Sequence, residues 1–194
     1  AARAFVVLAE QAPQPLDLRL RLPALQRPLA VHAFAASRIE IDVEVRGAAA
    51  AGDEVVVADG VYTGTGSKNL DFGGKLITVR SASGDPAACI IDCEGSGRGF
   101  YFHSGETAEA MVQGFTIRNG YVTSSSPGSY YGGGVYVNGA SPIIRQCTLN
   151  SNQTAYGAGA YIQDGAPQIV NCAFIGNAAT TELKYGGGMF ISTG

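Results

Sequence analysis

The residues whose types and spacing suit chemistry are mainly aromatic, and they recur in a fixed pattern along the second half of the chain. Three segments read YYGGGVYVNG, AYGAGAYIQDG and KYGGGMFISTG, and a looser copy reads GFYFHSG. In each full copy a tyrosine, three small residues and an apolar-aromatic-apolar triplet follow in order. The central aromatic residues of the triplets are Tyr101, Tyr136, Tyr161 and Phe190, and the tyrosines before the small residues are Tyr131, Tyr156 and Tyr185. The apolar flanks of each triplet are expected to face the core, so the middle rings should form an external aromatic ladder. Rings repeated in this way either stack on a ligand or stabilise one another.

Few ionisable groups accompany these rings. A polar row follows the triplets and consists of His103, Asn138, Gln163 and Ser192, with Asp164 directly after its third member. His103 and Asp164 belong to copies two repeats apart, about 10 Å by strand spacing, which is too far for a hydrogen bond. We therefore predict no catalytic residue, and we group His103 and Asp164 with the seven aromatic residues as candidate ligand-binding positions.

The sequence also offers few candidate metal ligands. Asp92 and Glu94, in the segment CIIDCEG, are expected to point to one side of an extended strand. A calcium site there would need further oxygen ligands from other repeats. Cys89 and Cys93 are four residues apart, whereas the zinc motif has two intervening residues. The prediction is no metal and no cofactor, with calcium at the two carboxylates as the alternative.

A repeat of about 25 residues sets these positions. Residues 134–152 align with residues 159–177 at a constant offset of 25, which matches Cys147 with Cys172 and Asn152 with Asn177. Each copy contains three short runs in which apolar residues alternate, separated by turns that use many of the 27 glycines. Such runs are typical of one coil of a parallel solenoid, with coils about 4.8 Å apart. The cysteine pair is expected to stay reduced, because in-register side chains match disulfide geometry poorly. The asparagine pair is expected to form a ladder that satisfies turn backbone groups.

The pattern of small residues, apolar-Tyr-apolar, Pro-Ile-Ile, Cys-Thr-Leu and Asn resembles the right-handed parallel β-helix repeats of the pectin-lyase-like superfamily. It is most similar to bacterial surface repeat proteins related to polymorphic outer-membrane proteins, over residues 53–194. The resemblance implies an all-β, right-handed parallel β-helix of five to six coils. In the enzymes of that superfamily, polysaccharide lies over the first-strand sheet and meets charged catalytic groups, whereas Tyr and Phe hold these positions here. The fold carries lyases, hydrolases, adhesins and stalks alike, so it implies no single activity.

The first part of the chain has a different composition. Residues 1–45 hold 5 of the 10 arginines and no Lys, Gly or Cys, and we predict an N-terminal extension and cap there. Residues 1–36 are either an ordered extension or a loosely held segment, and both alternatives stay open. The run RIEIDVEVR alternates like a strand, although the resemblance implies an amphipathic helix at this point. Residues 46–194 are predicted to form the β-helix, continuing into further coils beyond Gly194.

Charge and hydropathy restrict the partners. A net charge of -3 offers no basic surface for nucleic acid, and no apolar stretch approaches the roughly 20 residues that span a bilayer. From the resemblance we expect an extracellular or cell-surface bacterial protein with a structural or adhesive role, contacting polysaccharide or surface glycan. The alternative is a polysaccharide lyase or glycoside hydrolase acting in the first-strand groove. A third alternative is the passenger of an autotransporter-like protein.

Overall fold

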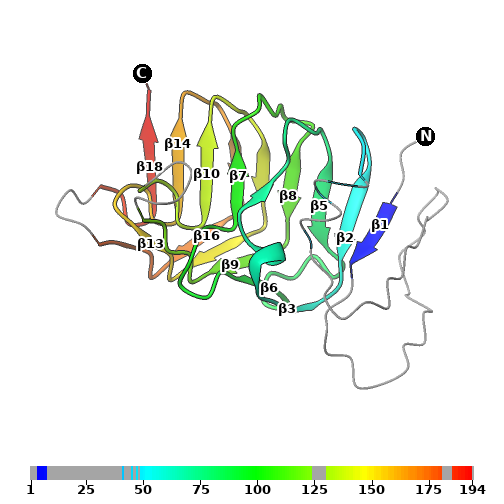
Figure 1. Cartoon of the computed structure of the whole chain (residues 1–194), viewed down its shortest axis with the longest axis horizontal. Coiled ribbons are helices and arrows are strands. Elements are labelled where there is room, and N and C mark those ends of the chain that lie inside the picture. Colours follow the sequence, from blue (N-terminus) through cyan, green and yellow to red (C-terminus); the bar gives the residue numbers. More distant parts are fainter. Residues whose placement is uncertain are drawn as a thin grey trace.

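The computed structural model describes residues 4–7, 41, 45, 47, 49–123, 130–180 and 185–193. They form an all-β solenoid in which each coil adds one strand to each of three parallel sheets (Figure 1). The described part contains one short 3-10 helix, at Thr65–Ser67. None of its helical segments is long and apolar enough to cross a bilayer. The predicted parallel β-solenoid is therefore confirmed.

Three sheets run along the solenoid, and all of their paired strands are parallel. The first-strand sheet, which carries the apolar-aromatic-apolar triplets, contains β4 (Leu70–Asp71), β7 (Phe100–Phe102), β10 (Val135–Asn138), β14 (Ala160–Gln163) and β18 (Met189–Ser192). The second-strand sheet contains β1 (Ala4–Val7), β2 (Glu54–Val57), β5 (Thr78–Ser81), β8 (Met111–Gln113), β11 (Ile143–Arg145) and β15 (Gln168–Val170). The third-strand sheet contains β3 (Gly60–Tyr62), β6 (Cys89–Asp92), β9 (Thr116–Arg118), β12 (Thr148–Asn150) and β16 (Ala173–Ile175). A small extra sheet pairs β13 (Gln153–Thr154) with β17 (Ala178–Ala179).

The solenoid makes about four turns, so the predicted five to six coils were too many. Pairing of β4 with β7 joins Leu70 to Phe100, and pairing of β7 with β10 joins Phe100 to Val135. These partners are 30 and 35 residues apart, because the turns of the earlier coils are longer than those of the repeat at offset 25. The same length of chain therefore completes fewer turns.

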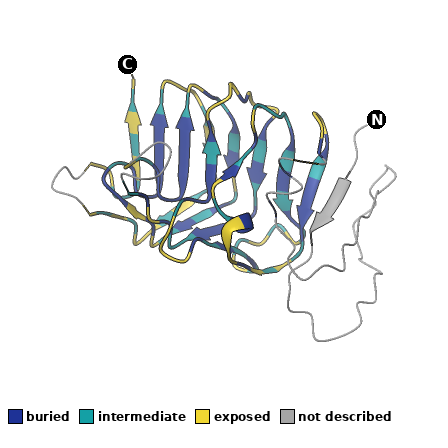
Figure 2. Ribbon diagram, viewed as in Figure 1, coloured by how far each residue is buried: buried dark blue, intermediate teal, exposed yellow. Residues whose placement is uncertain are grey.

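The core fills the space between the three sheets with alternating side chains from every strand. In the first-strand sheet, Phe102, Val137 and Ile162 stack in register and are all buried (Figure 2). Four phenylalanines, Phe72, Phe100, Phe102 and Phe115, pack together within the same core. Burying a side chain of this size contributes roughly 1.5–3 kcal/mol, so the core is the main source of stability.

The described residues of the N-terminal region contact the solenoid at two places. Strand β1 pairs in register with β2, from Ala4 opposite Glu54 to Val7 opposite Val57, so this part of the predicted extension joins the second-strand sheet. Ile41 and Val45 have helical backbone and are buried with Ala49 in the core. The strand prediction for this run is therefore wrong at Ile41 and Val45. A spacing of four places Ile41 and Val45 on one helix face, where they pack on the core together with Ala49. The rest of residues 1–36 lies outside the described residues.

The turns contain the predicted asparagine ladder. Asn152 is fully buried, and its Nδ2 donates to the carbonyl oxygen of Ile117 and to Oδ1 of Asn177, at 3.0 Å each. Asn177 donates in turn to the Leu149 carbonyl oxygen at 2.8 Å. The ladder therefore ties three successive coils together at one corner, which confirms its structural role.

Candidate functional site

The outer row is the set of middle residues of the first-strand sheet, which stack in register on the side away from the core. It consists of Asp71, Tyr101, Tyr136, Tyr161 and Phe190. The flanking residues point inward, as predicted. Four aromatic rings and one carboxylate thus share a single line along the solenoid axis.

A second line of tyrosines lies against the outer row. Tyr131, Tyr156 and Tyr185 form parallel bridges with one another, and we call them the covering row. The ring of Tyr131 stacks on that of Tyr161 at a centroid distance of 4.4 Å, and Tyr156 stacks on Tyr185 at 5.5 Å. The seven predicted aromatic residues therefore form one continuous cluster.

The covering row hides part of the outer row. Tyr136 and Tyr161 expose only 3% and 6% of their surface, although neither belongs to the core, whereas Tyr185 is 48% exposed. The expectation of an open aromatic ladder is therefore wrong at Tyr136 and Tyr161. Sequence alternation gives the side of the sheet on which a ring lies, but not what a neighbouring turn places over it.

The hydroxyl groups of the outer row are held by the polar row of the next coil. The Tyr136 hydroxyl donates to Oε1 of Gln163 at 2.9 Å, and hydrogen bonds likewise join Tyr101 to Asn138 and Tyr161 to Ser192. Burial raises the pKa of Tyr136 to about 12, with the neighbouring tyrosines adding to the effect. These rings are thus fixed at both faces and at the hydroxyl.

Arg98 is a member of this cluster that sequence reasoning missed. Its guanidinium carbon lies 4.9 Å from the ring centre of Tyr101 and 5.1 Å from that of Tyr136, and the residue is 2% exposed. Burial lowers the pKa of Arg98 to about 10, and the two tyrosines oppose that shift. By register Arg98 is equivalent to Gly133, the middle of a small triplet. An arginine where the other repeats have Gly or Ala was the available signal.

An acid and a histidine meet at the first coil of the outer row. Nε2 of His103 lies 3.1 Å from Oδ2 of Asp71, and the His103 ring stacks on Tyr101 with a centroid distance of 4.0 Å. The structure pairs His103 with an acid one coil earlier, not with Asp164, which lies in a turn with φ 49° after β14. The alternation Leu70-Asp71-Phe72, like that of the later triplets, was the missed signal for Asp71.

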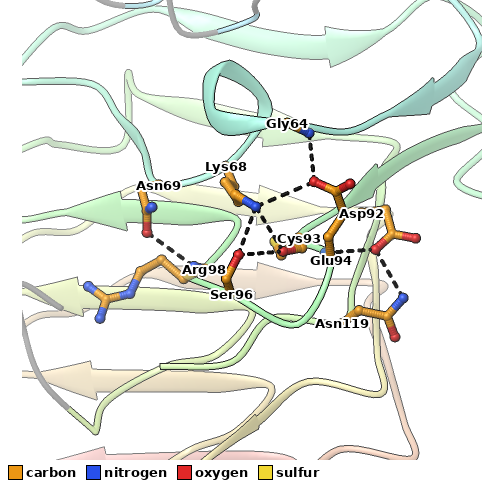
Figure 3. Close-up of polar contacts among 9 residues, drawn as sticks. All are labelled: Gly64, Lys68, Asn69, Asp92, Cys93, Glu94, Ser96, Arg98 and Asn119. Carbon is orange, nitrogen blue, oxygen red and sulfur yellow. Dashed lines mark hydrogen bonds and ion pairs between the residues drawn. The ribbon is translucent and has the colours of Figure 1, made fainter. Parts of the chain in front are cut away.

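The predicted calcium position consists of the carboxylates of Asp92 and Glu94. Each of them forms hydrogen bonds with other groups of the protein (Figure 3). Asp92 ends β6 and accepts hydrogen bonds from Arg118 and Asn119, at 2.8 and 3.0 Å. Glu94 lies beyond the strand, in a turn with φ 54°, and accepts from Lys68 Nζ and from the Gly64 backbone N–H. The prediction that both acids leave one extended strand is therefore wrong. Among the described residues no group of three or more His, Cys, Asp or Glu is placed to hold a metal ion.

The four cysteines are free thiols in the structure. Cys147 and Cys172 occupy equivalent positions in adjacent coils, as predicted, and each donates to backbone carbonyl oxygens at 3.2–3.5 Å. A hydrogen bond between the two thiols and burial raise the pKa of Cys147, whereas the same hydrogen bond lowers that of Cys172. Burial raises the pKa of Cys89 and of Cys93 to about 12.

No protein-family model matches the chain, and comparisons with curated proteins and with solved structures found no match either.

Proposed function

We propose that this chain is the β-solenoid scaffold of a secreted or cell-surface bacterial protein, related to the pectin-lyase-like superfamily, with a structural or adhesive role. The supporting observation is the state of the outer row. Its rings stack at 5.0 Å between Tyr101 and Tyr136 and at 5.6 Å between Tyr161 and Phe190, and the tyrosine hydroxyls bind the next coil. Aromatic pairs of this kind contribute roughly 0.5–1.5 kcal/mol each. A face built in this way strengthens the contacts between coils.

The proposal includes contact with a glycan at the exposed edge of the aromatic cluster. Tyr185 is 48% exposed, and its neighbour Phe190 is half-buried. Their ring centres are 5.7 Å apart, so together they offer an aromatic surface. A pyranose ring has an apolar face of C–H groups that packs on such a surface.

A glycan array probed with the wild-type chain and two variants tests the adhesive role. Tyr185→Ala removes an exposed ring and is expected to weaken retention of the bound glycan about tenfold, or about 1.4 kcal/mol. Tyr161→Phe keeps the ring at a covered position and is the matched control, expected to retain the glycan like wild type. Retention of no glycan by the wild-type chain would contradict the adhesive role.

The Asp71–His103 pair favours a second candidate function, a polysaccharide lyase or glycoside hydrolase. The pair lies on the first-strand sheet, its carboxylate and imidazole are 3.1 Å apart, and both side chains are partly exposed, at 21% and 34%. A histidine held by a carboxylate is suited to proton transfer. Glycans retained on the array are therefore also analysed for chain length. If the wild-type chain shortens the glycan and His103→Ala does not, the result favours an enzyme. If the glycan is recovered intact, the result favours the scaffold role.

A further inference from the structure

A second candidate site lies at the corner where the chain leaves the third-strand sheet. A trough of about 450 Å³ is formed there by turn residues of four successive coils. Its side chains come from Glu94, Asn119, Tyr121, Ser151, Gln153 and Thr180. Coils are about 4.8 Å apart, so these positions span roughly 14 Å along the axis. The volume lies within the range of sites for small organic ligands.

Regular backbone contacts hold this corner. Tyr121 forms a parallel bridge with Gln153, and the Tyr121 N–H donates to the Gly97 carbonyl oxygen at 2.8 Å. The Gln153 N–H donates to Gly120 at 2.7 Å, and the Thr180 N–H donates to Thr154 at 2.9 Å. Because backbone ladders fix the lining residues, the trough is part of the rigid solenoid.

The trough offers hydrogen-bonding groups that the described part of the chain does not use. The side chains of Tyr121, Gln153 and Thr180 are exposed there and make no hydrogen bond to any described residue. The Asn119 amide donates to Asp92 through Nδ2, which leaves its carbonyl oxygen as an acceptor. The lining therefore presents hydroxyls and amides, which both donate and accept.

The charge of the trough is small. Among the described lining residues Glu94 is the one that is charged, and its carboxylate is 3.4 Å from Lys68 Nζ (Figure 3). These described residues include no aliphatic side chain, and their one large apolar surface is the ring of Tyr121, 42% exposed. Groups of this kind complement a ligand that is neutral, rich in hydroxyls and partly apolar on one face.

We propose that this corner trough binds a neutral oligosaccharide, with one sugar ring packed on Tyr121 and hydroxyls bonded to Gln153, Thr180 and Asn119. The inference rests on the proposed glycan-contacting role, and the described lining of the trough shares no residue with the aromatic cluster. A peptide would need apolar pockets or a free strand edge, and the lining supplies neither. Among the described residues, the lysine near the trough, Lys68, is already paired with Glu94, so it offers an acidic sugar no free cation.

Nuclear magnetic resonance titration of the full chain tests the site. The probes are the neutral trisaccharides cellotriose, mannotriose and xylotriose, with trigalacturonate as the acidic counterpart. We expect at least one neutral probe to shift the amide signals of Gly95, Gly120 and Tyr121 in a saturable way. Trigalacturonate is expected to bind at least about tenfold more weakly, a difference of about 1.4 kcal/mol or more.

Two variants and one control assign the binding. Tyr121→Ala and Gln153→Ala are each expected to weaken binding of the neutral probe, the first about tenfold and the second by a smaller factor. Tyr130→Ala removes a tyrosine that is 40% exposed outside the trough, and it is expected to change nothing.

The outcomes separate the trough from the proposed role. Absence of saturable shifts at the trough amides, or affinity that Tyr121→Ala and Gln153→Ala both leave intact, overturns the trough proposal. If the array nevertheless retains a glycan that Tyr185→Ala releases, the adhesive role stands with the aromatic cluster as its site. If the wild-type chain retains no glycan on either test, the role and the trough both fail.

Discussion

Tyr136 connects three coils of the solenoid through one side chain. Its ring stacks on Tyr101 of the preceding coil, and its hydroxyl donates to Gln163 of the following coil. Arg98 adds a cation 5.1 Å from the ring centre. Because ionisation of the phenol would place a charge in this covered position, the neutral form is strongly favoured in the folded state.

We predict that alkaline pH destabilises the chain partly through Tyr136. Its folded-state pKa is raised to about 12 from an unfolded value of 10.0, so its contribution is fully present below pH 10 and is lost as pH rises through 12. This contribution is at most about 2.7 kcal/mol. Tyr136→Phe should cost about 1 kcal/mol at neutral pH through the lost hydrogen bond, and less at high pH.

Urea unfolding of wild type and Tyr136→Phe at a series of pH values measures this difference. Tyr130→Phe, at an exposed position, is the control. A gap between wild type and Tyr136→Phe that stays constant or widens as pH passes 10 would contradict the prediction.

For single residues, the sequence predicted the side of the sheet that a side chain faces better than it predicted how exposed that side chain is. Alternation placed Val135 and Val137 in the core and Tyr136 on the other side, and the structure confirms it. The cover over Tyr136 includes Tyr131, in the turn just before β10, and the contact between His103 and Asp71 requires the register of β4 with β7. Alternation within one strand gives neither the position of a turn side chain nor the register of a strand outside the strict repeat.

The turn into the first-strand sheet depends on small residues for two separate reasons. Gly132, Gly157 and Gly186 open their triplets with φ of 56–63°, a region that disfavours other residues. Gly134 and Gly159 close theirs where the next coil approaches, and a Cβ at Gly134 would overlap the Gly159 carbonyl oxygen. Each triplet therefore combines a conformational requirement with a steric one.

We predict that Gly134→Ala destabilises the chain by about 3 kcal/mol, because the added methyl group must displace the backbone of the next coil. Gly139→Ala is the matched control, since φ there is 63° but a Cβ would meet nothing within 4 Å. The control should lose about 1 kcal/mol from strain alone. Urea unfolding midpoints give both values, and equal losses would show that close approach between coils is not limiting at Gly134.

Prediction of elements from sequence succeeded where the repeat was strict. The offset of 25 gave the register of β10 with β14 and of β12 with β16. It failed before residue 99, where longer turns obscured Leu70-Asp71-Phe72 as a first-strand triplet and inflated the number of coils. Around Ile41 and Val45 apolar residues at every second position also recur at every fourth position, so the pattern fits a strand and a helix alike. The helix is the form in which these residues cover the core.

Stability in a stacked solenoid comes from contacts between neighbouring coils, so a coil covered on one side is held less firmly. Strands β1 and β18 lie at opposite ends of the described stack (Figure 1). Ile162 in β14 is 4% exposed, whereas its register partner Ile191 in β18 is 58% exposed. Figure 2 shows the same contrast between the two strands, with β14 mostly buried and β18 partly exposed. Ala160 and Met189 differ in the same way, at 1% and 41%.

For the isolated 194-residue chain, we predict that amide hydrogen exchange follows this difference along the axis. The amides of β15, β16 and β18 should exchange at least about a hundredfold faster than those of β7 and β10, a gap of about 2.7 kcal/mol in opening free energy. Exchange measured at several protein concentrations separates two explanations, because pairing of exposed ends between copies would slow exchange of β18 as concentration rises. Uniform protection of all five first-strand segments at low concentration would show that the chain opens only as a whole. In that case the contacts between coils would be strong enough to transmit stability to a coil that is covered on one side.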